Sequence, residues 1–211
     1  MKKTILFIFI AVCMIGAYAQ EENALSKFYG GVRVGFTATQ ISGDDLVGFN
    51  QLGGTAGLFV NHAVVPSGRL KLQLELNFTM KGSHSTSPKN QPANNFYSLR
   101  LGYVEVPLML VWTAGKWSLW GQKFQFDLEV GPCFGVNVFA TEREANGPIL
   151  GPPFRRFEFS GIGGITLNIA EHHSANFRFN GSFIPVRKPS WGRVYKDQFN
   201  TALIIGYCYQ F

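Results

Sequence analysis

The histidines are the residues of this sequence whose types and spacing come nearest to catalytic or metal-binding chemistry. His84 lies between Ser83 and Ser85, and a serine close to a histidine is the pairing from which an activated nucleophile is built. Adjacent residues of an extended chain point apart, however, and no acid stands where it would orient the imidazole. His172 and His173 are adjacent but lack the further ligands that a metal site requires. We therefore expect no enzyme, no catalytic residue, no bound metal and no cofactor.

Charged and apolar residues alternate over long stretches, and this alternation defines the elements that would position any functional group. In RLKLQLELNFTMKG, residues 69–82, apolar side chains occupy every second position. Side chains of a β-strand point alternately to its two faces, so a period of two predicts a strand with one apolar and one charged face. The apolar face contacts either the core of a soluble sandwich or the lipid of a membrane.

The same alternation recurs and predicts eight strands, whereas no long segment keeps a helical period. In the fourth strand the apolar phase slips near Gly102, because Leu99 and Leu101 share one parity while Val104 and Val106 share the other. A slip of one residue is typical of a β-bulge, so we expect all four side chains on the apolar face. The predicted strands span about 28–39, 52–63, 69–82, 96–112, 123–139, 156–169, 176–185 and 198–211.

Strand length and composition favour lipid over a soluble core. Strands of about 9–11 residues cross a membrane, whereas strands of soluble proteins average about 5–6 residues. The third and fifth predicted strands are long enough to cross a membrane. Only 15% of the residues are charged, against about 25% in ordinary soluble domains. Aromatic residues such as Trp112, Trp117 and Trp120 gather near strand ends, as at a membrane interface. We predict an all-β fold, an eight-stranded antiparallel up-and-down transmembrane β-barrel.

The connections between the predicted strands alternate in character. Those after the first, third, fifth and seventh strands are polar and rich in Gly or Pro, while the others are mostly shorter, such as TAGKWSLWGQ at residues 113–122. An even number of strands brings both termini to one side of the membrane. By the usual layout of outer-membrane barrels, we expect periplasmic termini and four outer loops.

The first residues, MKKTILFIFIAVCMIGAYAQ, have the pattern of a secretory signal peptide. Lys2 and Lys3 precede an apolar run, and Ala17 and Ala19 fit a small-residue cleavage site before Gln20. We expect residues 1–19 to be removed and residues 20–211 to form the barrel domain. The formal charge of the whole chain is only +6, two units of which come from Lys2 and Lys3, so an exported chain of this kind does not indicate nucleic-acid binding.

Several motifs resemble those of one family of barrels. The chain ends in YCYQF, which is similar to the C-terminal strand by which outer-membrane barrels are recognised for assembly, with Tyr207, Tyr209 and Phe211 as the signal residues. The segments 42–44 (SGD), 81–82 (KG) and 103–108 (YVEVPL) resemble motifs of the PorT-type outer-membrane β-barrel family of Bacteroidetes-like bacteria. This resemblance implies a barrel in the outer membrane of a Gram-negative bacterium and little about activity. It also implies two partners, outer-membrane lipid and the barrel-assembly machinery.

The polar faces of the predicted strands would form the barrel interior. Eight strands enclose a space just wide enough for side chains, and buried charges have to pair. A plug of paired side chains is therefore favoured, and a narrow pore is the alternative. Cys133 and Cys208 share the inward parity at different heights, too far apart for a disulfide, so we expect free thiols. The predicted interior charges are Arg33, Lys71, Glu75, Arg100, Glu105, Lys123, Asp127, Glu129, Arg156, Glu158 and Arg178.

The function expected from these features is non-enzymatic. A structural or surface-interaction role through the four outer loops ranks first, a narrow pore for small solutes second, and a lipid-modifying outer-membrane enzyme third. A further envelope protein could be a partner, but the sequence does not identify one.

Overall fold

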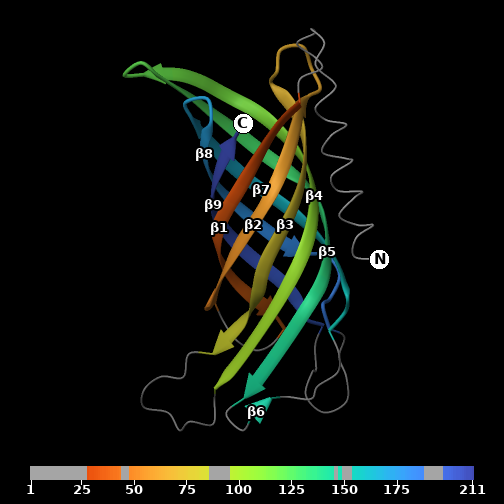
Figure 1. Ribbon diagram of the computed structural model, residues 1–211. Helices are drawn as coiled ribbons and strands as arrows, with labels where there is room; N and C mark the ends of the chain where they lie inside the picture. The colour runs from red at the N-terminus through yellow and green to blue at the C-terminus, as the bar shows by residue number, and fades with distance from the viewer. Residues whose placement is uncertain (1–27, 44–47, 86–95, 145–146, 149–153, 188–196) are drawn as a thin grey trace, which may run out of the picture.

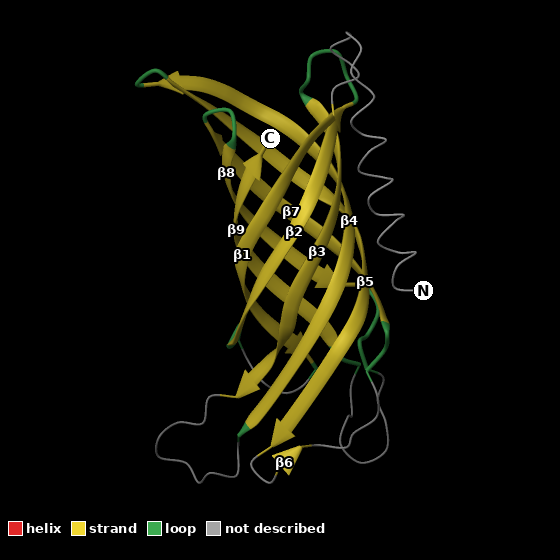
Figure 2. Cartoon of the chain, viewed as in Figure 1, coloured by secondary structure: helices red, strands yellow, loops and turns green. Residues whose placement is uncertain are grey.

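The computed structural model describes residues 28–43, 48–85, 96–144, 147–148, 154–187 and 197–211. The described chain contains only strands and their connections (Figure 2). No helix among these residues is long and apolar enough to cross a membrane. The strands are β1 (Phe28–Ser42), β2 (Gln51–Ala63), β3 (Leu70–Ser85), β4 (Tyr97–Leu119), β5 (Gln122–Glu144), β6 (Gly147–Pro148), β7 (Phe157–Ile169), β8 (His173–Ser182) and β9 (Phe199–Gln210).

Eight of these strands form a closed antiparallel ring, which confirms the predicted barrel (Figure 1). The order around the ring is β1, β2, β3, β4, β5, β7, β8 and β9, and β9 pairs back onto β1 from Gly31–Gln210 to Ser42–Phe199. The two-residue β6 pairs only with the end of β5, outside the ring. Closure satisfies the backbone groups of the ring within the sheet, as a wall surrounded by lipid requires.

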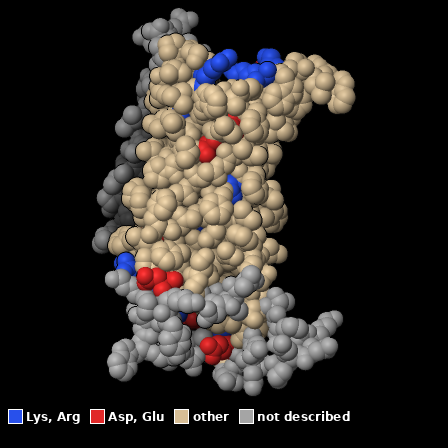
Figure 3. Space-filling model, turned by 180° about the vertical axis from the view of Figure 1, so that it is seen from behind, with Lys and Arg blue, Asp and Glu red and all other residues tan. Residues whose placement is uncertain are grey.

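The wall of the barrel is apolar on its outside. Leu72, Leu74 and Leu76 of β3 are 42%, 47% and 40% exposed, while the alternating Glu75 is 2% exposed. Soluble proteins have the opposite arrangement, with apolar side chains inside and charges in water. The space-filling view shows a wall of mostly uncharged residues, with Lys and Arg gathered at one end (Figure 3). The apolar faces therefore point to the surroundings, as the long alternating runs predict.

Strand β4 corrects one detail of the predicted facing. Leu99 and Leu101 are fully buried and point inward with Tyr103, not outward. A register shift does occur at Gly102/Tyr103, but the extra residue is Val138 of β5, so β4 keeps its parity from Leu99 to Thr113. The sequence pattern was misleading here because this end of the interior has a small apolar layer of its own. That layer consists of Ile41, Leu99, Leu101 and Tyr103.

The connection predicted at residues 113–122 is mostly strand. β4 continues to Leu119 and pairs with β5 down to Gln122. The turn is reduced to Trp120 and Gly121, with φ of 50° and 76°, and two positive φ values are typical of the tight turns that suit the twist of a hairpin. The β4–β5 hairpin consequently extends beyond the rest of the ring, at the upper left of Figure 1.

Both described chain ends lie at the same end of the barrel, where the amide of Phe211 donates to the carbonyl of Gly30. The connections at this end are 64–69, 120–121 and 170–172, and we call it the short-turn end. The opposite end, the long-loop end, carries the connections that follow β1, β3, β5 and β8. The predicted signal peptide, residues 1–19, lies outside the described residues. That the short-turn end faces the periplasm remains a prediction.

Cys133 on β5 and Cys208 on β9 are both buried and free, as expected. The two strands are separated by β7 and β8 in the ring. We therefore predict that the chain 20–211, denatured without reductant, takes up two alkyl groups, as measured by intact mass. Uptake of none, with the mass 2 Da below the reduced chain that a disulfide requires, would contradict the strand order.

Candidate functional site in the barrel interior

Glu75 of β3 is the centre of the largest charge cluster inside the barrel. Its carboxylate accepts hydrogen bonds from Arg33 of β1 at 2.6 Å and from both terminal nitrogens of Arg178 of β8 at 2.9 and 2.8 Å. Arg178 also pairs with Glu129 of β5 at 2.5 Å. These four side chains are at most 4% exposed. Two cations thus balance two anions, and the cluster reaches across the interior between four strands.

Neutral side chains complete this cluster, which we call the central cluster. Gln73 and Asn77 donate to Glu75 at 2.6 and 2.8 Å, and Thr166 donates to Glu129. Gly164 leaves the room that Arg178 occupies, because a Cβ there would lie 2.7 Å from Cγ of that arginine. Pairing and additional hydrogen bonds offset the desolvation cost of a buried charge.

A second cluster surrounds Lys81, closer to the long-loop end of β3. Its ammonium group lies 2.7 Å from Glu105 and 2.9 Å from Glu158, and 5.2 Å from the centre of the Tyr103 ring. Asn180 accepts a hydrogen bond from Lys81 at 3.3 Å, and Asn200 donates to Glu158 at 2.9 Å. One cation therefore holds two carboxylates, and β3, β4, β7, β8 and β9 are joined by this cluster.

A third pair lies at the long-loop end. Arg187 makes a two-pronged contact with Glu142 of β5 at 3.0 and 2.6 Å and covers the ring of Phe154 at 3.7 Å. Tyr97 of β4 donates to the same carboxylate at 2.8 Å. The side chains of Arg187 and Glu142 are 5% and 8% exposed. This pair therefore joins the bases of three long connections, those that follow β3, β5 and β8.

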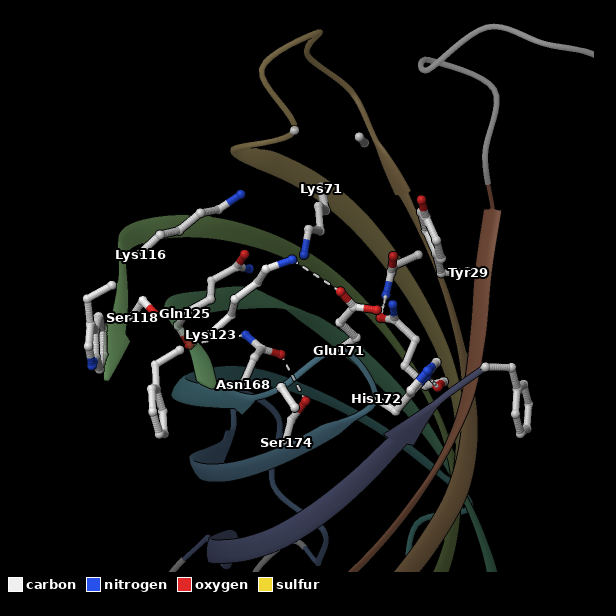
Figure 4. Close-up of a pocket in the computed structure, with 18 residues that line it drawn as sticks. Tyr29, Lys71, Lys116, Ser118, Lys123, Gln125, Asn168, Glu171, His172 and Ser174 are labelled. Carbon is white, nitrogen blue, oxygen red and sulfur yellow. Dashed lines mark hydrogen bonds and ion pairs between the residues drawn. The ribbon is translucent and has the colours of Figure 1, made fainter. Parts of the chain in front are cut away.

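The short-turn end opens into a cavity of about 750 Å³. The lining residues Gln125 and Asn168 donate hydrogen bonds to buried Asp127, which lies 4.0 Å from Lys71. At its rim, Lys123 pairs with Glu171 at 3.2 Å, with both side chains more than 70% exposed. Figure 4 shows the lining side chains, with Lys71, Lys116 and Lys123 from β3, β4 and β5 and others from the β7–β8 hairpin.

Seven of the eleven predicted interior charges are buried inside the barrel. They are Arg33, Glu75, Glu105, Asp127, Glu129, Glu158 and Arg178.

The other four lie elsewhere, which corrects the prediction. Arg100 is exposed on the outside because β4 keeps its parity. Arg156 is exposed just before β7 begins. Lys71 and Lys123 have the inward parity but lie at the open mouth, where the side chains are 25% and 79% exposed.

Lys81, Glu142 and Arg187 are buried charges that the predicted interior set does not include. Lys81 was recoverable, because it shares the parity of Glu75 on the same strand. Glu142 was hidden by the bulge at Val138, after which the inward parity on β5 changes. Arg187 lies beyond β8, in a connection where no periodicity applies, and is positioned by tertiary contacts such as the bridge to Gln198.

In the described part of the chain, the predicted Ser–His pair and the two adjacent histidines have structural contacts. Ser83 faces the buried interior, while the ring of His84 packs edge-on against Phe96 at 5.7 Å. His172 and His173 contact the C-terminal strand, the latter bonding to the hydroxyl of Tyr207 at 2.5 Å. No group of three His, Cys, Asp or Glu side chains in the described part of the chain is arranged to hold a metal ion.

The C-terminal aromatic residues form an outer row on β9 and beyond it. Tyr207 and Phe211 are 45% and 68% exposed, and Tyr209 packs against His172, His173 and Phe211. A role of this row in assembly remains a prediction.

A closed ring with an apolar outside and a charged, internally paired interior defines a transmembrane β-barrel, since only a closed sheet satisfies its backbone in lipid. The family model for the outer membrane protein beta-barrel domain matches residues 18–187. The chain belongs to this family and is an outer-membrane protein.

Two solved structures illustrate what the chain is similar to. The crystal structure of Ail, the attachment invasion locus protein of Yersinia pestis, has 10% sequence identity and a TM-score of 0.45, covering 88% of this chain and 99% of that one. Neisserial surface protein A has 8% identity and a TM-score of 0.41, covering 87% and 97%. No curated protein sequence matches the chain.

Proposed function

We propose that this protein is a non-enzymatic surface-interaction protein of the outer membrane, whose barrel is a sealed support and whose contacts are made by the long-loop end. The observation that carries the proposal is the filled interior. The central cluster and the Lys81 cluster extend between opposite strands with hydrogen bonds of ordinary length. Opening a water path would break several buried ion pairs at once.

The long-loop end supports the second part of the proposal. The pair of Arg187 and Glu142, with Tyr97 and Phe154, fixes the positions from which three of the long connections leave the barrel. Binding residues commonly lie on loops that a rigid scaffold positions. A plugged barrel has this scaffold property and no transport path.

We expect the purified chain to produce no discrete conductance steps in a planar lipid bilayer. The reason is that each cross-section through the clusters is occupied by paired side chains, as the width of an eight-stranded barrel allows. The control is an eight-stranded barrel with known open-channel events, reconstituted in the same way. Regular, reproducible steps from the wild-type chain would favour the alternative, a narrow pore for small solutes.

The interaction itself is tested by purification from native membranes. Residues 86–95 and residues 188–196 are each replaced by a Gly-Ser linker of equal length, with heat-dependent gel migration as the control for folding. A protein that co-purifies with the wild type and is lost in either variant supports the proposal. Partners retained equally by both variants and the wild type would place the contact away from these loops.

A further inference from the structure

The β4–β5 hairpin exposes a free strand edge at the short-turn end. The last β3–β4 pair joins Leu70 to Trp112, and the amide of Thr113 donates to the carbonyl of Arg69 at 2.7 Å. Beyond this point, residues 115–119 pair with β5 on one side, and no strand of the described chain pairs with the other side of residues 114–119. An open edge presents unpaired backbone donors and acceptors to another extended chain.

A β-bulge next to this edge changes the side of β4 on which Lys116 lies. The β4–β5 register shifts between Thr113 and Gly115, after which Lys116 lies opposite Gln125 and Ser118 opposite Lys123. Gln125 and Lys123 have the inward parity of β5, so the bulge brings Lys116 onto the cavity side. Without it, Lys116 would share the outer face with Trp112.

The cavity beside the edge is large and carries more cationic than anionic groups. Lys71, Lys116 and Lys123 line the mouth of about 750 Å³, against Glu171 as the lining carboxylate. The three lysines come from adjacent strands β3, β4 and β5 (Figure 4). Lys116 is exposed, and no other described residue forms an ion pair with it. Volumes of about 300–1,000 Å³ are typical of ligand sites.

We propose that the short-turn mouth binds an acidic, extended peptide segment of a partner protein, which adds as a strand along residues 114–119 and places a carboxylate against Lys116, while Lys71 and Lys123 add positive charge to the mouth. This site is independent of the function proposed for the long-loop end.

A peptide fits these observations better than a lipid headgroup or a free anion. Strand addition takes its affinity from backbone hydrogen bonds and its specificity from alternate side chains, and a free edge next to cationic side chains offers both. The length of the open edge, residues 114–119, matches an ordinary strand of about five to six residues. A lipid headgroup would use the lysines and leave the edge unpaired.

The test uses the folded chain in phosphatidylcholine vesicles and a fluorescent octapeptide that alternates Glu and Val. We expect saturable binding that weakens with added salt, because exposed charges are screened. The variant Lys116→Glu should weaken binding about tenfold, since a favourable pair becomes a repulsion. Amide hydrogen exchange of residues 114–119 should slow when the peptide binds, because the free edge acquires partners.

Matched controls separate binding by strand addition from binding by charge alone. Arg100→Glu makes the same charge change on the outer wall toward the long-loop end and should leave the affinity unchanged. A peptide of the same charge with two Val replaced by Pro cannot donate along a strand and should bind at least tenfold more weakly. Equal binding of the two peptides, unchanged exchange at 114–119, or equal losses in Arg100→Glu and Lys116→Glu would overturn the proposal. Loss of the long-loop partner described above would not affect this result.

Discussion

The variant Glu75→Gln is expected to lower the free energy of unfolding by about 3–5 kcal/mol, the cost of removing one partner from a buried ion pair. Five hydrogen bonds end on this carboxylate, three of them from the guanidinium groups of Arg33 and Arg178. Glutamine has nearly the same shape but no charge, so Glu129 alone would balance two buried cations. Urea titration in lipid vesicles, with the folded fraction read from unheated gel migration, measures the change.

Two further variants show whether the loss comes from the buried charge. Glu171→Gln removes a carboxylate from an exposed pair with Lys123, for which the expected change is at most about 1 kcal/mol. The double variant Glu75→Gln/Arg33→Gln restores the balance of charges in the central cluster and should regain part of the stability. An effect of Glu75→Gln no larger than that of Glu171→Gln would mean that the central cluster is not a paired, dry network.

The variant Leu74→Arg is expected to lower the free energy of unfolding by about 2–4 kcal/mol, the cost of placing arginine on the lipid face near the bilayer midplane. Leu74 is 47% exposed and lies in register with Val60 and Leu108, at the middle of the outer apolar face of β3 and β4. The side chain would have to carry its charge through the apolar wall to reach water. The same urea titration in vesicles measures this change.

The same substitution at Leu52 is the matched control. Leu52 is 74% exposed on the outer face, but it lies one residue after β2 begins, at the long-loop end. The cost of arginine falls to about 0–1 kcal/mol near the membrane interface, so Leu52→Arg should be nearly neutral. Equal effects at Leu52 and Leu74 would contradict the position of the membrane along the barrel axis.

Much of the fold was predictable from local pattern. A period of two is a property of neighbouring residues, so the run from Leu70 to Met80 identifies a two-faced strand without knowledge of any partner. The number of such runs, their length and the low content of charge then favour a membrane barrel. The inward facing of Glu75, Asp127 and Arg178 follows from the same parity.

The pattern failed where the interior does not follow the rule that apolar side chains face lipid. Leu99 and Leu101 lie in an apolar layer inside the barrel, which reverses the predicted facing of Arg100 between them. The extension of the β4–β5 hairpin was not predicted, for another reason. Residues 114–119 are stabilised as a strand mainly by pairing with β5, and pairing is not visible in the composition of a Gly- and Trp-containing segment.

The sequence by itself determined that this protein alternates apolar and charged faces along eight strands, because side-chain direction in a strand depends only on position. The tertiary structure decided which charges meet. Glu75 binds Arg33, 42 positions away, and Arg178, 103 positions away. It also decided that Lys81 lies between Glu105 and Glu158 and that Lys71 and Lys123 reach an open mouth. The physical reason is that strand stagger and closure of the ring set the height of each side chain, and these arise from pairings between distant segments.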